Sequence, residues 1–283
     1  MAGRSPAAPG LSYSIQKTMS ATSDTPHSHS PSSPGKTAGE GLAADIAANL
    51  AFIRERIDAA AARAGRDPGA VRLMAVSKTR PPEAVQAALA AGQTLFGENR
   101  VQEAVDKIDA IAGLKSAELD TGGTVPEWHL IGHLQTNKAR FIPERFAAVQ
   151  SLDSIRLAEA LEKHAANAGR VLEVYFQLNL DGEATKAGLR DEEELGKLIE
   201  AVAGCPNLSP RGLMAIPDPT LGEAATRGLY GRIREMLERV KTAYALGAAF
   251  NQLSLGMSHD FEWAVEEGAT VVRVGTAIFG ARP

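Results

Sequence analysis

The sequence has 283 residues and a formal net charge of −4, and 44% of the residues are hydrophobic. This is the composition of a globular protein, and the slight acidic balance gives no basic field for nucleic acid or an anionic membrane. The single cysteine, Cys205, excludes an intrachain disulfide and fits a reducing compartment, so we expect a cytoplasmic protein. No apolar run approaches the roughly 20 residues that span a bilayer.

Residues 1–41 differ from the rest of the chain. They are rich in Ser, Pro, Thr, Gly and His and have almost no periodic apolar pattern, so they cannot bury enough surface to fold. They also lack the continuous apolar core of a signal peptide. We therefore predict a disordered N-terminal extension over residues 1–41 and a single folded domain over residues 42–283.

Regular patterns begin with an amphipathic helix over residues 44–64, in which Ile46, Leu50 and Ile53 recur at spacings of three and four. Eight short apolar runs then alternate with helical patterns. Strands are predicted at Val71–Ser77, Thr94–Phe96, Trp128–Ile131, Ala147–Leu152, Val171–Leu180, Arg211–Ile216, Gln252–Leu255 and Val271–Val274. Helices are predicted near Pro82–Ala91, Arg100–Ile111, Lys138–Phe141, Ser154–Ala168, Asp191–Ala203, Leu221–Ala245 and Phe261–Glu266.

This alternation determines the predicted fold class, α/β. Continuous apolar strands are typical of a parallel sheet covered by helices, and eight of them predict a TIM (β/α)8-type barrel. A doubly wound open sheet is the alternative, but no Gly-x-Gly-x-x-Gly turn follows the first strand. No helix is predicted after the last strand, because the sequence ends at Pro283, and we expect the helix at 44–64 to take that place.

In such a barrel the chemistry lies at the C-terminal ends of the strands. Lys78 directly follows the first predicted strand, where burial would lower the pKa of its ammonium group and leave an amine that can attack a carbonyl. A surface lysine is the alternative, and position alone favours it. Asn99 follows the second strand, either as a ligand contact or as the N-cap of the helix that starts at Arg100.

Two histidines accompany the third strand. His129 within it is either a hydrogen-bonded core residue or a ligand-facing one, whereas His133 in the next loop is expected at the barrel mouth. No third ligand stands at a recognisable spacing, so we predict no metal site. Lys186, in the polar loop after the fifth strand, is a second and weaker candidate for binding a phosphorylated ligand.

The loops after strands seven and eight combine small and hydroxylated residues, namely Gly256, Ser258, Gly275 and Thr276. Barrels often bind phosphate at these two loops through close backbone approach and hydroxyl donors. Ordinary turns would explain either loop alone, but their occurrence together favours a phosphate site. Arg273, inside the last strand, must either pair with an acid or serve a ligand, for example by donating to a ring nitrogen.

Six segments carry a more specific pattern. In chain order they are AVSKT (75–79), FGENRVQE (96–103), WHLIGHLQTNK (128–138), GLMAI (212–216), LGMS (255–258) and VRVGTAIFG (272–280). Together they resemble the pyridoxal phosphate homeostasis protein family, which is related to the N-terminal barrel domain of alanine racemase. The resemblance covers the chain from the first strand to its end and leaves out the N-terminal extension.

The resemblance implies a fold-type III barrel that holds pyridoxal 5'-phosphate (PLP) as a Schiff base on Lys78. It further implies cofactor contacts by Ser258, Gly275 and Thr276 to the phosphate, by Arg273 near the pyridine nitrogen, and by Asn99 and Met257 beside the ring. The implied role is intracellular vitamin B6 homeostasis without robust catalysis. Apo PLP-dependent enzymes are candidate recipients of the cofactor.

A PLP-dependent, racemase-like enzyme is the alternative function, and a class I aldolase-like barrel is a third that the family motifs argue against. Racemisation needs acid/base groups on both faces of the Cα atom. Racemases similar to this fold carry a second, β-rich domain that helps to build a dimeric site, and this sequence ends at Pro283 without one. The carboxylates Glu98, Glu103 and Asp260 stand in no spacing that singles out a base. We therefore expect a monomeric binding protein with no catalytic residues.

Overall fold

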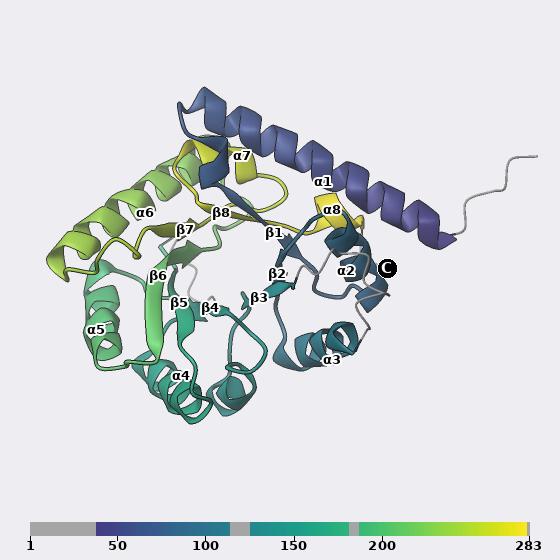
Figure 1. The fold of residues 1–283 in the computed structure, drawn as a ribbon. Coiled ribbons are helices and arrows are strands. Elements are labelled where there is room, and N and C mark those ends of the chain that lie inside the picture. The colour runs from purple at the N-terminus through teal and green to yellow at the C-terminus, as the bar shows by residue number, and fades with distance from the viewer. Residues whose placement is uncertain (1–37, 114–124, 181–186, 282–283) are drawn as a thin grey trace, which may run out of the picture. The chain divides into compact units, whose positions relative to one another are not determined.

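A computed structural model describes residues 38–113, 125–180 and 187–281. In this part of the chain eight parallel strands close into one barrel in sequence order, as Figure 1 shows, so the predicted TIM-barrel fold is confirmed. The strands are β1 (Arg72–Val76), β2 (Leu95–Glu98), β3 (Glu127–Leu130), β4 (Ala148–Leu152), β5 (Leu172–Leu178), β6 (Leu208–Ala215), β7 (Gln252–Ser254) and β8 (Val271–Val274).

Helices surround the barrel and connect its strands (Figure 1). The α-helices are α1 (Ala38–Arg63), α2 (Pro82–Ala90), α3 (Val101–Ala112), α4 (Ile155–Asn167), α5 (Glu192–Ala203), α6 (Glu223–Ala243), α7 (Phe261–Glu266) and α8 (Thr276–Phe279). Two short 3-10 helices, η1 (Pro68–Ala70) and η2 (Thr136–Phe141), complete the described elements. None of the described helices combines the length and the hydrophobicity that a membrane span needs.

Apart from the unpredicted 3-10 helix η1 and from shifts of up to three residues at element ends, the observed elements differ from the predicted ones in three places. The connection after β3 contains the 3-10 helix η2 rather than an α-helix. A single helical turn, α8, follows β8, where no helix was predicted. Helix α1 begins at Ala38 rather than at residue 44, so the predicted boundary at residue 41 falls in its first turns. The sequence before Ala38 lies outside the described residues.

The barrel closes because β1 pairs with a strand on each side. Ala75 is in register with Phe96 of β2 and with Val274 of β8. Along β1 the side chains alternate: Leu73 and Ala75 join the large apolar core shared with the helices, whereas Met74 and Val76 belong to a smaller cluster inside the barrel. The interior is therefore separate from the helix-covered layer.

Helix α1 completes the outer ring. It packs against α7, α8 and α2, which follow one another along its length (Figure 1). Its buried face consists of Ile46, Leu50, Ile53, Ile57, Ala60 and Ala61. On the rim, Arg63 binds Glu262 and Glu266 of α7 at 2.8 and 2.6 Å. The expectation that the first helix takes the place of the last one is thus confirmed, since α8 is too short to cover the β8–β1 seam.

Candidate functional site

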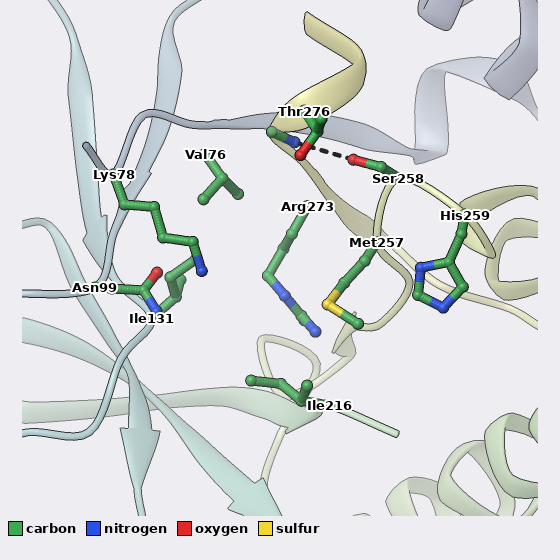
Figure 2. A pocket seen from close by; sticks show the side chains of 11 residues that line it. Val76, Lys78, Asn99, Ile131, Ile216, Met257, Ser258, His259, Arg273 and Thr276 are labelled. Atoms are coloured by element: carbon green, nitrogen blue, oxygen red, sulfur yellow. Dashed lines mark hydrogen bonds between the residues drawn. The ribbon is translucent and has the colours of Figure 1, made fainter. Parts of the chain in front are cut away.

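A cavity of about 230 Å³ opens at the C-terminal ends of the strands. All seven cofactor-binding residues predicted from the sequence line it, together with four others (Figure 2). The lining residues are Val76, Lys78, Asn99, Ile131, Ile216, Met257, Ser258, His259, Arg273, Gly275 and Thr276. Segments from six strand ends and loops, up to 200 positions apart in the sequence of 283 residues, therefore meet in one place.

Lys78 follows β1, and its half-buried side chain points into the cavity (Figure 2). Both neighbours of Lys78 are held by hydrogen bonds. The Ser77 hydroxyl donates to Glu98 at 2.7 Å, and the backbone N–H of Thr79 donates to the Glu103 carboxylate. Thr79 has a φ of 64°, which is rare for a β-branched residue, so the Glu103 contact supports an unfavourable turn. The lysine thus extends from a fixed backbone.

Asn99 directly follows β2 and lines the same cavity as Lys78 (Figure 2). The N-cap position of α3 is occupied by Arg100, so the N-cap alternative for Asn99 is wrong. The Oδ1 atom of Asn99 is buried and has no hydrogen-bond partner within the described part of the chain. Gly132 allows the Asn99 backbone to come this close, because a Cβ atom at position 132 would lie only 2.2 Å from the Asn99 backbone carbonyl oxygen. A buried acceptor without a partner is costly unless a ligand satisfies it.

The loops after β7 and β8 meet on the opposite side of the cavity (Figure 2). The backbone N–H of Gly275 donates to the Ser258 hydroxyl at 3.3 Å, and Thr276 lines the same cavity. Gly256 does not line the cavity. Its φ is 81°, and a Cβ atom at this position would lie only 2.6 Å from the Ala264 side chain, so the loop needs glycine there.

Asp260 fixes the loop that carries Met257 and Ser258. Its buried carboxylate accepts hydrogen bonds from the Met257 N–H at 2.6 Å and from the Tyr230 hydroxyl at 2.8 Å. Burial, with the negative charge of Asp260, raises the pKa of Tyr230 above its ordinary value, so the phenol stays a donor. Asp260 was a carboxylate without an assigned role in the sequence, and the structure places it behind the loop rather than in the cavity.

Arg273 occupies the floor of the cavity and is only 3% exposed. Its Nη1 atom donates to the Ser254 carbonyl and, at 2.7 Å, to the Ser254 hydroxyl, while Nη2 donates to the Ala215 carbonyl at 2.7 Å. No carboxylate pairs with it among the described residues, so the internal salt bridge considered from the sequence is not observed there. Burial lowers the pKa of Arg273 to about 10, which leaves the guanidinium charged at neutral pH.

Apolar side chains separate the polar groups. Val76, Ile131 and Ile216 line the cavity with Met257, and sequence reasoning did not select the first three as site residues. They stand at or just after the ends of β1, β3 and β6, which is the signal that could have found them. The cavity thus combines apolar walls with the Lys78 amine, the Asn99 amide oxygen and the Arg273 guanidinium. The hydroxyls of Ser258 and Thr276 add two further polar groups. This set fits a flat heteroaromatic ring that carries a carbonyl and an anionic group.

The other predicted residues lie outside this cavity. His129 is fully buried and hydrogen-bonded through both ring nitrogens, so it is a core residue. His133 is exposed at the mouth as expected, and Cys205 is buried at the end of α5. Lys186 lies outside the described residues. Within the described ranges, no group of three or more His, Cys, Asp and Glu side chains could hold a metal ion.

Comparisons with known proteins agree with this geometry. Residues 48–283 match the family described as alanine racemase, N-terminal domain. The chain is 46% identical over 237 residues to the pyridoxal phosphate homeostasis protein of Pseudomonas aeruginosa. This alignment covers 84% of this chain and 96% of the relative. It is 44% identical over 238 residues to the Escherichia coli protein of the same name, with coverage of 84% and 97%. The structure of PipY from Synechococcus elongatus with PLP bound superposes with a TM-score of 0.71 at 36% identity, over 83% of this chain and all of PipY.

Proposed function

Because this chain belongs to the pyridoxal phosphate homeostasis protein family, we propose that it binds PLP in the cavity at the barrel mouth and serves in PLP homeostasis. The observation that carries the proposal is the convergence of Lys78, Asn99, Arg273 and the β7 and β8 loops on one cavity. The solved relative with PLP bound supports the choice of cofactor.

Seven of the eleven lining residues have a chemical role in this proposal. The Lys78 amine condenses with the aldehyde of PLP, forming a Schiff base and releasing water. Ser258, Thr276 and the backbone of Gly275 supply hydrogen bonds to the phosphate, and Met257 covers the ring. Arg273 donates to the pyridine nitrogen and keeps it unprotonated, because a guanidinium does not give up its proton. The buried Asn99 oxygen accepts a hydrogen bond from a ring substituent.

The proposed role is to hold and deliver the cofactor in the cell. The relatives are named homeostasis proteins rather than enzymes, which supports a protein without robust catalysis. Apo PLP-dependent enzymes are the proposed recipients. The proposal includes a cytoplasmic monomer with an extension over residues 1–41 and the PLP-binding domain over residues 42–283.

Reductive labelling tests the Schiff base. Purified protein incubated with PLP should turn yellow, and borohydride should then fix one pyridoxyl group on Lys78, which peptide mass mapping locates. Lys78→Met should abolish the label. Lys138→Met is the matched control, because Lys138 is a half-buried lysine at the same end of the barrel that does not line the cavity. A label on another lysine, or no label, would contradict the proposal.

Racemisation is the alternative activity, because the chain matches the N-terminal domain of alanine racemase. PLP-loaded protein incubated with L-alanine or L-serine should leave the optical rotation unchanged over hours. Turnover that disappears in Lys78→Met would replace the binding role by an enzymatic one.

A further inference from the structure

A line of hydrogen-bonded side chains runs through the interior of the barrel, from the floor of the cavity to its opposite end. Ser254, which accepts from Arg273, donates from its hydroxyl to the Gln150 amide oxygen at 2.6 Å. The Gln150 amide nitrogen lies 2.9 Å from His129 Nδ1. His129 Nε2 lies 2.8 Å from the Glu127 carboxylate. Ser254, Gln150 and His129 are all fully buried.

This line is not a by-product of strand pairing. Ser254 belongs to β7 and Gln150 to β4, which are not neighbours in the sheet, so their hydrogen bond crosses the barrel interior. The interiors of such barrels are mostly filled with bulky branched side chains. Here two small apolar clusters, one around Met74 and one around Tyr175, leave room for polar groups. Because burying polar groups is costly, the line requires a reason.

The partners determine the direction of every bond. A guanidinium only donates, so the Ser254 hydroxyl must accept from Arg273 and direct its own hydrogen to the Gln150 oxygen. The Gln150 NH2 group therefore faces His129 and donates to Nδ1. This leaves the proton of the neutral imidazole on Nε2, which donates to Glu127. An ionised carboxylate only accepts, so the direction is consistent at both ends.

The far end of the line is firmly ionised. The hydrogen bond from His129, helped by Arg72 and opposed by burial, lowers the pKa of Glu127 to about 2. Arg72 also donates to the other Glu127 oxygen at 2.6 Å. Arg273, in contrast, has no carboxylate partner among the described residues. Its orientation depends on the neutral acceptors Ser254 and Ala215.

We propose that Ser254, Gln150 and His129 are positioning residues, which hold Arg273 in the orientation that donates to the cofactor ring. The inference rests on the proposed function of the cavity. Arg273 commits three of its five N–H groups to Ser254 and Ala215, so the direction of the remaining two is fixed. If the Ser254 side chain were released from Gln150, it could change rotamer, and the guanidinium would lose one of its three acceptors.

Histidine NMR tests the line without any cofactor. In nitrogen-15 histidine-labelled full chain at neutral pH, His129 should be neutral with its proton on Nε2. Ser254→Ala should shift the His129 ring signals, although Gln150 stands between the two residues. Ser151→Ala is the matched control, because Ser151 is equally buried on β4 but donates to the Gly132 carbonyl. A proton on Nδ1, or equal responses to the two substitutions, would overturn the line.

The cofactor spectrum tests the positioning. Gln150→Leu loaded with PLP should show a shifted absorbance maximum and roughly tenfold weaker binding, the scale of one hydrogen bond to a charged group. Gln93→Leu removes another buried amide, which donates to the Leu73 and Leu95 carbonyls, and it should leave the spectrum unchanged.

Two further outcomes separate the alternatives. If Gln150→Leu does not fold, Ser254→Ala carries the same spectral expectation. A wild-type spectrum and affinity in a folded variant of the line would show that Arg273 needs no such support. If the wild-type protein binds no PLP, the proposed function fails, whereas the NMR result still decides whether the line exists.

Discussion

Lys107 shows how one residue supports the site without entering it. It is 4% exposed, and its ammonium donates to the Ser77 carbonyl at 2.6 Å and to Glu98 at 2.5 Å. Glu103 lies 3.4 Å away as a third partner. Burial raises the pKa of Glu98 while Lys107 opposes that rise. A paired charge is tolerated in such a place, but removal of one partner leaves the other buried and uncompensated.

Lys107→Met should therefore cost about 3–5 kcal/mol in the free energy of unfolding, measured by urea denaturation. The double variant Glu98→Gln/Lys107→Met should recover much of that loss, because no lone charge stays buried. Lys197→Met is the control. Lys197 pairs with Glu193 at 2.6 Å on the exposed surface of α5, and its loss should leave the unfolding curve unchanged. Equal effects of the two lysine substitutions would show that the buried pair contributes little.

The sequence selected residues that line the cavity but not the residues that support them. Arg273 stands out because a charge inside an apolar strand has few explanations. Lys78 was selected only with the help of the family resemblance, since its position alone favoured a surface lysine. The partners of those residues do not stand out. Gln150 and Ser254 are 104 positions apart, and only the closed barrel brings them together. Likewise Asn99 satisfied the sequence rule for an N-cap, yet the helix begins one residue later.

At the scale of elements, α1 is part of the barrel rather than an appendage. Leu50 is fully buried in the core that the helices share with the strands. Asn49 donates to the Ile278 carbonyl of α8 at 2.9 Å, so α1 also holds the turn that follows the β8 loop. The arginines on its rim bind α7. These contacts connect the first helix to the segment that forms one wall of the cavity.

Leu50→Ala should consequently lower the free energy of unfolding of the whole domain by about 2–5 kcal/mol. The substitution leaves a void between α1 and the core, and the surrounding side chains cannot collapse to fill it. Phe52→Ala provides the comparison within the same helix. Phe52 is 60% exposed, so its substitution should lower the free energy of unfolding far less. Thermal and urea denaturation monitored by circular dichroism measure both. A loss of helix signal at low temperature with an unchanged main transition would mean that α1 folds independently of the barrel.

The elements themselves were predictable where periodicity is strong. The strand β8 has the predicted bounds, and α5 starts after Asp191, whose carboxylate accepts from the Glu194 N–H as an N-cap should. The pattern gave no indication of α8, because one helical turn carries no period. The connection at η2 was too short for the pattern to distinguish a 3-10 helix from an α-helix.

Across the whole molecule, the two ends of the barrel hold their charges differently. At the mouth, Arg273 has no carboxylate partner among the described residues, and the buried Asn99 oxygen has no hydrogen-bond partner there. At the opposite end the charges are paired across strands, with Arg72 of β1 bound to Glu127 of β3 and Arg211 of β6 bound to Glu173 of β5. A buried cation without a carboxylate partner fits a ligand site, and ion pairs between strands fit a role in stability.

The pairing at the far end has a pH dependence that can be measured. The folded pKa of Glu127, about 2, lies below its ordinary value near 4.5. Glu127 therefore favours folding above pH 4.5, and this contribution is lost as the pH falls toward 2. Glu127→Gln should lower the free energy of unfolding by about 1–2 kcal/mol at neutral pH, less than the full shift implies because the side chain is a third exposed.

The difference between wild type and Glu127→Gln should shrink steadily between pH 4.5 and pH 2, where the carboxylate becomes protonated. Glu193→Gln, which alters a 77% exposed carboxylate on α5, should follow the wild-type curve throughout. A difference that stays constant down to pH 2 would mean that hydrogen-bond geometry, rather than charge, supplies the stability. In that case the interior line would need only an acceptor at Glu127, and an ionised one would have no thermodynamic advantage.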